Sequence, residues 1–182
     1  MYLILSLLLS LAPVAQAGEL AGVTLPDNLT IGGTPVVLNG MGLREKYWID
    51  VYVGGLYLPT KTTSDTKAIQ DDVAKRIDMA FIYSKVTKEQ MVETFEEGLA
   101  KQPETAAALK DRYDRLTGMM DTVLSGEHVV FDYIPGQGTH VIVKGVDRGT
   151  IEGVDFMRSL FTIYLGASPP TANLKSGMLG GK

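Results

Sequence analysis

The chain has 182 residues, a formal net charge of −4 at neutral pH and no cysteine. The absence of cysteine excludes disulfides and thiolate metal sites, so the stability of the fold must come from packing. The acidic balance argues against a nucleic-acid partner, which would call for a basic stripe that this sequence lacks.

The first 17 residues carry no charged side chain and are typical of a secretory signal peptide. A leucine-rich run is followed by Ala15-Gln-Ala17, the small-residue pattern of a cleavage site. The run is shorter than the roughly 20 residues that span a bilayer, so we expect no membrane anchor. No Lys or Arg precedes it, which is atypical for such a signal. The sequence predicts a signal peptide at 1–17, one domain at 18–182, and a periplasmic or secreted product.

Several segments have the alternating apolar pattern of strands and are bounded by Gly, Pro, Asn or Asp. Between the last two of these segments, Pro135-Gly-Gln-Gly138 predicts a tight hairpin, because its glycines can take positive φ angles. This pairing would place Tyr133 near His140. The predicted strands are 29–38, 47–58, 76–83, 128–134 and 139–146.

Helical patterns occupy the middle and the end of the chain. The capping-box sequence Thr87-Lys-Glu-Gln90 opens the first helix, whose apolar stripe begins at Met91. The third helix is apolar on nearly every side and should be buried. Because runs of strands are interrupted by helices, we predict an α+β fold with helices on one face of a mostly antiparallel sheet. The predicted helices are 87–102, 104–116, 154–165 and 171–177.

Arg44 and Tyr52 are the candidate binding residues. A guanidinium matches a carboxylate bidentately, and a phenol can add a further hydrogen bond to the same oxygens. In an unbroken strand the two residues would lie roughly 27 Å apart. They can share a ligand only if the chain reverses between them, and the polar stretch 44–46 is the predicted turn, with Gly40 and Gly42 supplying backbone freedom.

Ordinary catalytic groups are scarce. The two histidines, His128 and His140, both fall in strand-like segments, and without a patterned carboxylate they make no metal site. Glu93, Glu96 and Glu97 lie on the polar side of a predicted helix, as a solvated face would. We therefore predict no metal site and no cofactor.

Two blocks of sequence, taken together, resemble the bacterial chalcone isomerase-like proteins, and they bracket residues 40–180. The resemblance implies an open-faced β-sandwich, with a large antiparallel sheet, helices over one face and a ligand cleft between the two layers. The first block contains Gly40-Met-Gly-Leu-Arg44, Val51-Tyr52 and Gly55-Leu-Tyr-Leu58. The second contains Phe131-Asp-Tyr-Ile-Pro-Gly-Gln-Gly-Thr139, Gly149-Thr-Ile-Glu-Gly153, Asp155-Phe156, Leu165-Gly166 and Leu174-Lys175.

Plant chalcone isomerases use an arginine, a threonine, a tyrosine, an asparagine and a further threonine or serine. Arg44 matches the arginine, whereas the other four positions fall on Tyr52, Met91 and Gly98 and near Met157. The reaction is an intramolecular oxa-Michael addition, which needs a positioned phenolate and donors aimed at the developing enolate. Met91 and Gly98 have no side-chain donor, so the comparison implies that chalcone isomerase activity is absent.

Arg44 with Tyr52 also resembles the site of the fatty-acid-binding branch of this superfamily, in which the pair holds the carboxylate and an apolar cleft takes the tail. The resemblance implies a fatty acid or a similar small amphiphilic acid as the ligand, with Met91, Gly98 and Met157 completing the site. The pair could instead be structural, with Arg44 neutralised by Asp50.

Two other functions remain open from the sequence. One is an isomerase or intramolecular lyase on an unidentified substrate, in which Arg44 is the electrophile and Tyr52 the acid. The other is an envelope protein that binds a partner protein and has a vestigial cleft.

Overall fold

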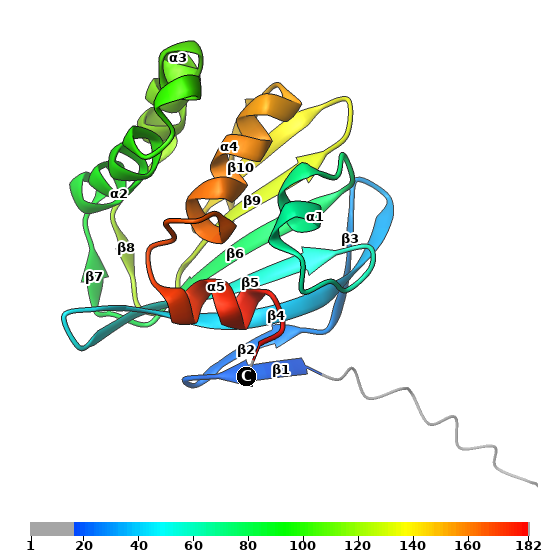
Figure 1. Cartoon of the computed structure of the whole chain (residues 1–182). Helices are drawn as coiled ribbons and strands as arrows, with labels where there is room; N and C mark the ends of the chain where they lie inside the picture. The colour runs from blue at the N-terminus through cyan, green and yellow to red at the C-terminus, as the bar shows by residue number, and fades with distance from the viewer. Residues whose placement is uncertain (1–16, 182) are drawn as a thin grey trace, which may run out of the picture.

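The structure is a computed structural model that describes residues 17–181. The predicted signal peptide lies outside this range, except for Ala17, which begins the first strand. A curled antiparallel sheet of seven strands, in the order β11-β10-β9-β6-β5-β4-β3, forms the centre of the molecule (Figure 1). Its strands are β3 Asn28–Ile31, β4 Thr34–Lys46, β5 Ile49–Leu58, β6 Lys75–Phe81, β9 His128–Ile134, β10 Gly138–Val143 and β11 Val146–Ile151.

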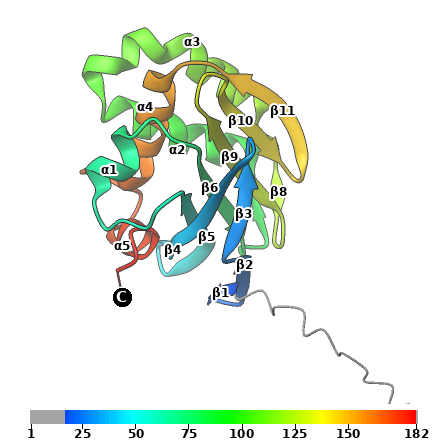
Figure 2. The same cartoon turned by 90° about the vertical axis from the view of Figure 1, so that its right-hand side faces the viewer.

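The helices lie on one face of this sheet, as Figure 2 shows for α1, α4 and α5. Two short hairpins accompany the sheet: β1 Ala17–Leu20 with β2 Val23–Pro26, and β7 Lys85–Val86 with β8 Val123–Leu124. The predicted α+β class, with helices over an antiparallel sheet, is confirmed. The helices are α1 Asp65–Gln70, α2 Lys88–Ala100, α3 Pro103–Met119, α4 Val154–Leu165 and α5 Ala172–Met178.

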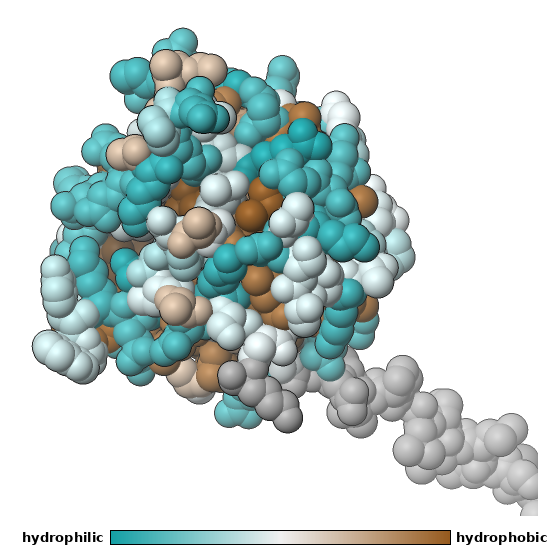
Figure 3. Space-filling view, in the orientation of Figure 1, coloured by the Kyte–Doolittle hydropathy of each residue, from teal (hydrophilic) through white to brown (hydrophobic). Residues whose placement is uncertain are grey.

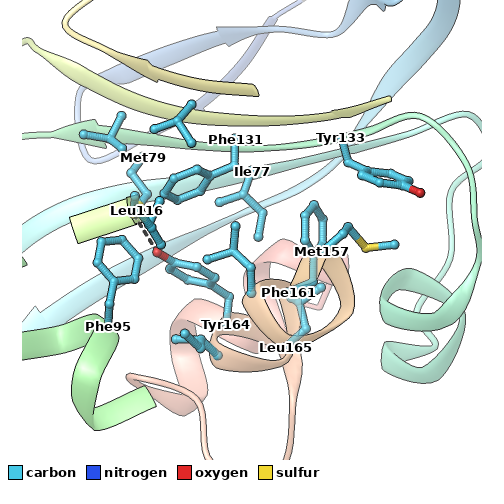
Figure 4. Packing of buried hydrophobic residues seen from close by; sticks show 14 of the residues in the cluster. Ile77, Met79, Phe95, Leu116, Phe131, Tyr133, Met157, Phe161, Tyr164 and Leu165 are labelled. Atoms are coloured by element: carbon cyan, nitrogen blue, oxygen red, sulfur yellow. Dashed lines mark hydrogen bonds between the residues drawn. The ribbon is translucent and has the colours of Figure 1, made fainter. Parts of the chain in front are cut away.

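The main core lies between the sheet and α4. This helix is apolar on nearly all sides because it is covered both by the sheet and by its neighbouring helices. Figure 4 shows Phe161 and Tyr164 of α4 packed toward Ile77, Met79 and Phe131 of the sheet. No helix among residues 17–181 is long and apolar enough to cross a membrane.

The first predicted strand, 29–38, is wrong as a single element, because it contains a hairpin. Gly32 and Gly33 both have positive φ angles and form the turn between β3 and β4. β4 then runs on to Lys46, through the stretch 44–46 that was predicted to turn. The reversal falls instead at Tyr47 and Trp48, where φ is 52° and 64°.

Gly40 and Gly42 do not form this turn; they let α5 lie directly on β4. A Cβ at Gly42 would collide with the carbonyl oxygen of Leu174, and one at Gly40 would collide with that of Gly177. Two glycines two residues apart on one strand face therefore make room for the backbone of a helix.

The side chain of Asn39 fixes the same junction. Its amide nitrogen donates to the carbonyls of Met178 at 2.8 Å and Thr62 at 3.0 Å, and its oxygen accepts from the Thr62 backbone N–H at 2.7 Å. Because Asn39 is buried, these bonds supply partners that water cannot. The residue ties β4 to α5 and to the loop before α1.

The predicted hairpin between β9 and β10 is present, but its strands pair in a register that differs by one residue from the predicted register. Tyr133 pairs with Thr139, whereas His140 pairs with Asp132. Tyr133 belongs to the core under the helices, and adjacent residues of a strand point to opposite faces, so His140 lies on the other face of the sheet.

Candidate functional site

A cavity of about 350 Å³ lies between the sheet and the helical layer. This volume is within the range of about 300–1,000 Å³ that is usual for small-molecule sites. β4, β5 and β6 form one wall, α2 and α4 form the other, and exposed side chains surround the mouth. The cavity is lined by Arg44, Lys46, Tyr47, Ile49, Val51, Tyr52, Met79, Phe81, Tyr83, Val86, Gln90, Met91, Thr94, Phe95 and Tyr164.

Arg44 and Tyr52 meet at this cavity because they are direct partners in the β4–β5 pairing. A register shift between Arg44 and Glu45 bulges the strand at this point, and bulges commonly re-aim a side chain. The Arg44 guanidinium donates from Nη1 to the carbonyls of Pro170 at 3.0 Å and Glu45 at 3.2 Å. The hairpin therefore brings together the two residues that the sequence singled out.

The Arg44 guanidinium forms no ion pair of 4 Å or less with any carboxylate among residues 17–181. Asp50 is exposed and pairs in register with Glu45. The internal neutralisation of Arg44 by Asp50 is thus not formed. A partly buried cation with only carbonyl partners is well suited to an added anion.

The Tyr52 hydroxyl is buried and has no hydrogen-bond partner within the described part of the chain. The side chain is only 6% exposed, and its ring packs on Phe81 with 5.3 Å between ring centroids. Burial raises the pKa of Tyr52, and the Arg44 guanidinium, which lies close to the phenol oxygen without completing a hydrogen bond to it, opposes this effect only in part. The phenol is therefore neutral at ordinary pH and has a proton to donate.

A second buried phenol, Tyr164, reaches the same cavity from α4. Its hydroxyl donates to the sulfur of Met79 at 3.3 Å (Figure 4). A thioether is a weak acceptor, so this hydroxyl is poorly satisfied. Burial also raises the pKa of Tyr164 well above its ordinary value. The sequence reasoning missed this residue, since nothing in the apolar pattern of the helix distinguishes it from the core.

The other three predicted site residues are placed differently from one another. Met91 lines the cavity from α2 and is buried. Gly98, about two turns further along α2, does not line this cavity; a Cβ there would press on Ile163. It borders a separate hollow of about 70 Å³ that also touches Arg44. Met157 is fully buried in α4 outside the cavity, and Figure 4 shows it extending toward Tyr133.

Both histidines lie away from the cavity. His128 Nδ1 is 2.7 Å from an oxygen of Asp78, and this contact raises the pKa of His128. The His140 ring contacts the Thr150 hydroxyl at 3.1 Å. In the range 17–181, no group of three or more His, Cys, Asp or Glu is arranged to hold a metal ion.

These features define an α+β protein with a cavity between one antiparallel sheet and its helical layer. The chain belongs to the chalcone isomerase-like family, whose family model matches residues 17–180. The solved structures that resemble it include the crystal structure of a fatty-acid binding protein of Arabidopsis thaliana, AtFAP1. The match has a TM-score of 0.72 and 18% sequence identity and covers 90% of this chain and 96% of that one, which shows a shared fold. No curated protein matches this sequence.

Proposed function

We propose that this protein binds a fatty acid or a similar small amphiphilic acid, without catalysis. The carboxylate is held by Arg44 and Tyr52, and the tail lies along the apolar wall that includes Met91. One observation carries the proposal: Arg44 and Tyr52 lie at the same cavity, and each lacks a partner that a carboxylate could supply. Among residues 17–181, Arg44 has no carboxylate partner and the buried Tyr52 hydroxyl has no hydrogen-bond partner.

The polar groups favour a carboxylate over a neutral head group. A guanidinium and a carboxylate form charge-assisted hydrogen bonds that are roughly twice as strong as neutral ones. The neutral Tyr52 phenol can donate to the same oxygens, which would satisfy the hydroxyl that the ligand-free fold leaves without a partner. Binding would therefore neutralise Arg44 and satisfy Tyr52 in a single step.

The remaining wall favours an acyl tail. Met79, Phe81, Met91 and Phe95 line the cavity and are buried, and each methylene of a ligand placed against such a surface gains about 0.8 kcal/mol. Methionine side chains adapt to irregular chains because they are flexible and polarisable. The similarity to AtFAP1, a fatty-acid binding protein, supports the same ligand class.

The lining residues also explain why we propose binding rather than turnover. The residues that line the cavity, all from the described part of the chain, include no carboxylate and no histidine. Such a site has no ordinary general base near neutral pH. An isomerase acting through Arg44 and Tyr52 alone would have an electrophile and an acid but no group to take up a proton.

Native mass spectrometry of the purified protein tests the proposal, followed by denaturing extraction to identify any small molecule it carries. We expect one acyl ligand per chain, and uptake of added fatty acid but not of its methyl ester. Arg44→Ala should weaken binding by at least about tenfold, because a hydrogen bond to a charged group is worth about 1.5–3 kcal/mol. Arg148→Ala, an exposed arginine on β11, is the matched control. A wild-type protein that neither carries nor takes up fatty acid would overturn the proposal.

We further propose that residues 1–17 direct export to the periplasm or the medium and are then removed. The uncharged leucine-rich run and the Ala15-Gln-Ala17 pattern support this proposal. Cell fractionation with N-terminal sequencing should find the protein outside the cytoplasm and beginning at Gly18. A product that stays in the cytoplasm with Met1 intact would contradict it.

A further inference from the structure

The mouth of the cavity carries an unusual group of exposed side chains. Trp48 is 96% exposed and Tyr47 79% exposed, and Ile49 and Tyr83 beside them are also exposed. We call these four residues the aromatic tip. They make up most of the large exposed apolar side chains in the described range, which otherwise include Leu124 and Val146. Figure 1 shows the β4–β5 turn projecting at lower left, and Figure 3 shows a pale protrusion at the same place.

The backbone of this turn is unfavourable for the residues it holds. Tyr47 and Trp48 both have positive φ, as a two-residue hairpin turn of type I′ requires. Such turns favour Asn-Gly, because a bulky side chain is strained in the left-handed region. Since Trp48 is almost fully exposed, packing within the fold does not offset this strain. Two large aromatic residues are therefore held in solvent at a position where smaller residues would be more stable.

The aromatic tip is continuous with the cavity. Tyr47, Ile49 and Tyr83 line it, whereas Trp48 stands beyond it at the end of the hairpin. Any surface that covers the tip would also lie against the opening through which a ligand enters. The aromatic tip therefore forms part of the mouth of the cavity.

We propose, on the basis of the binding function proposed above, that the aromatic tip docks on the surface of a lipid bilayer. Docking presents the cavity mouth to the membrane, so that the acyl ligand moves between bilayer and cavity without crossing bulk water. Trp and Tyr are the side chains that prefer the membrane–water interface, because their rings are apolar and their polar groups remain hydrated. A protruding hairpin can enter that interface without burying the rest of the surface.

The charges around the tip fit a bilayer of any headgroup charge. Lys46 and Lys85 are exposed here, and so is Asp50, with Glu45 partly exposed. These charges nearly cancel, so the attraction comes from the aromatic rings rather than from anionic lipid. Docking should therefore occur on zwitterionic vesicles and depend little on salt.

The chain contains its own probe for this contact, because Trp48 is the only tryptophan. Addition of phosphatidylcholine vesicles should shift its emission to the blue, and lipids brominated near the headgroup should quench it. In flotation assays the wild-type protein should rise with the vesicles. Trp48→Asn should reduce flotation at least about tenfold, and it should fold because Asn tolerates positive φ. Val146→Asn, an exposed apolar residue on β11, is the matched control and should float as the wild type does.

Transfer kinetics connect docking to the ligand. The rate constant for transfer of a fluorescent fatty acid from the wild-type protein to acceptor vesicles should rise with vesicle concentration, as a collisional step requires. With Trp48→Asn this dependence should disappear, whereas the affinity for fatty acid in solution should not change, since Trp48 does not line the cavity. Arg44→Ala should still float with vesicles, so failure of ligand binding and failure of docking are separable.

Two results would overturn the inference. One is a Trp48 emission that does not respond to vesicles together with an absence of flotation. The other is a dimer, seen by light scattering, that forms through the tip and dissociates in Trp48→Asn without any vesicle binding, which would assign the tip to a second copy of the chain.

Discussion

Arg44 and Tyr52 face each other across the β4–β5 hairpin as register partners, and this pairing turns two distant positions of the sequence into one site. The turn at Tyr47 and Trp48 makes the pairing possible. The same hairpin therefore carries the head-group residues at the third register pair from its turn and the mouth of the cavity at the turn itself.

Tyr52→Phe should have opposite effects on stability and on binding. The substitution removes a buried hydroxyl that has no partner among the described residues, so the free energy of unfolding of the ligand-free protein should rise by about 1 kcal/mol. Affinity for a fatty acid should fall by about tenfold, because a hydrogen bond to the carboxylate is lost. Urea unfolding and calorimetric titration measure the two effects. A loss of stability without ligand would show that the hydroxyl already has a partner.

Met91→Ala should change the preference for chain length. Met91 lines the cavity, so its truncation makes room for a longer tail, and each added methylene should strengthen binding by about 0.8 kcal/mol, or roughly fourfold. Met157→Ala is the control: it removes an equally buried methionine outside the cavity, so it should lower stability by about 2 kcal/mol or more without changing the preference. A competition assay with acids of graded length distinguishes the two. Equal shifts in both variants would argue against this placement of the tail.

Gly42→Ala should destabilise the fold by about 1–3 kcal/mol or more, because the new methyl group would collide with the Leu174 carbonyl under α5. Gly118→Ala is the control. It lies in α3 with open space around it and should stabilise by about 0.5–1 kcal/mol through helix propensity. Denaturant unfolding of both variants gives the comparison. A neutral Gly42→Ala would mean that α5 can move off β4 at little cost.

His128 should make stability depend on pH. Its hydrogen bond with Asp78 raises its pKa above the ordinary 6.5, so the folded state holds the proton more tightly than the unfolded state. The resulting stabilisation is complete below about 6.5 and is lost as the pH rises through the raised folded pKa. Asp78→Asn should bring the pKa down and flatten this dependence. NMR titration of the two histidines measures the pKa of His128, and the His128→Gln variant identifies which signal belongs to it. An unchanged His128 titration in Asp78→Asn would contradict this prediction.

Long periodic elements could be predicted closely from the sequence, and short or irregular ones could not. The buried helix α4 and the strand β9 have the predicted bounds, because their patterns end at Gly166 and at Pro135. The short helix α1 and the strands β1, β2, β7, β8 and β11 were not predicted, since a few residues contain too little periodicity. The predicted strand 139–146 ran through the turn at Lys144 and Gly145, both of which have positive φ.

The candidate site, like the fold, could be predicted only in part from the sequence. Arg44 and Tyr52 could be selected from residue chemistry and from the family resemblance. Their contact depends on the turn at Tyr47 and Trp48, and the sequence pattern does not predict a turn there. Tyr47 and Trp48 are residues typical of strands, and propensity alone places them inside one. Tyr164 could not be found because only the three-dimensional packing separates a cavity-facing residue of a buried helix from its neighbours.

The contact between β4 and α5 has a consequence for when the protein can fold. Asn39 and Met178, which are 139 positions apart, must meet before this face of the sheet is covered. A nascent chain therefore leaves that face of β4 open until α5 has been synthesised, and folding is completed only after that point. With the export proposed above, this order of events would keep the nascent chain in the unfolded state that a secretion channel accepts.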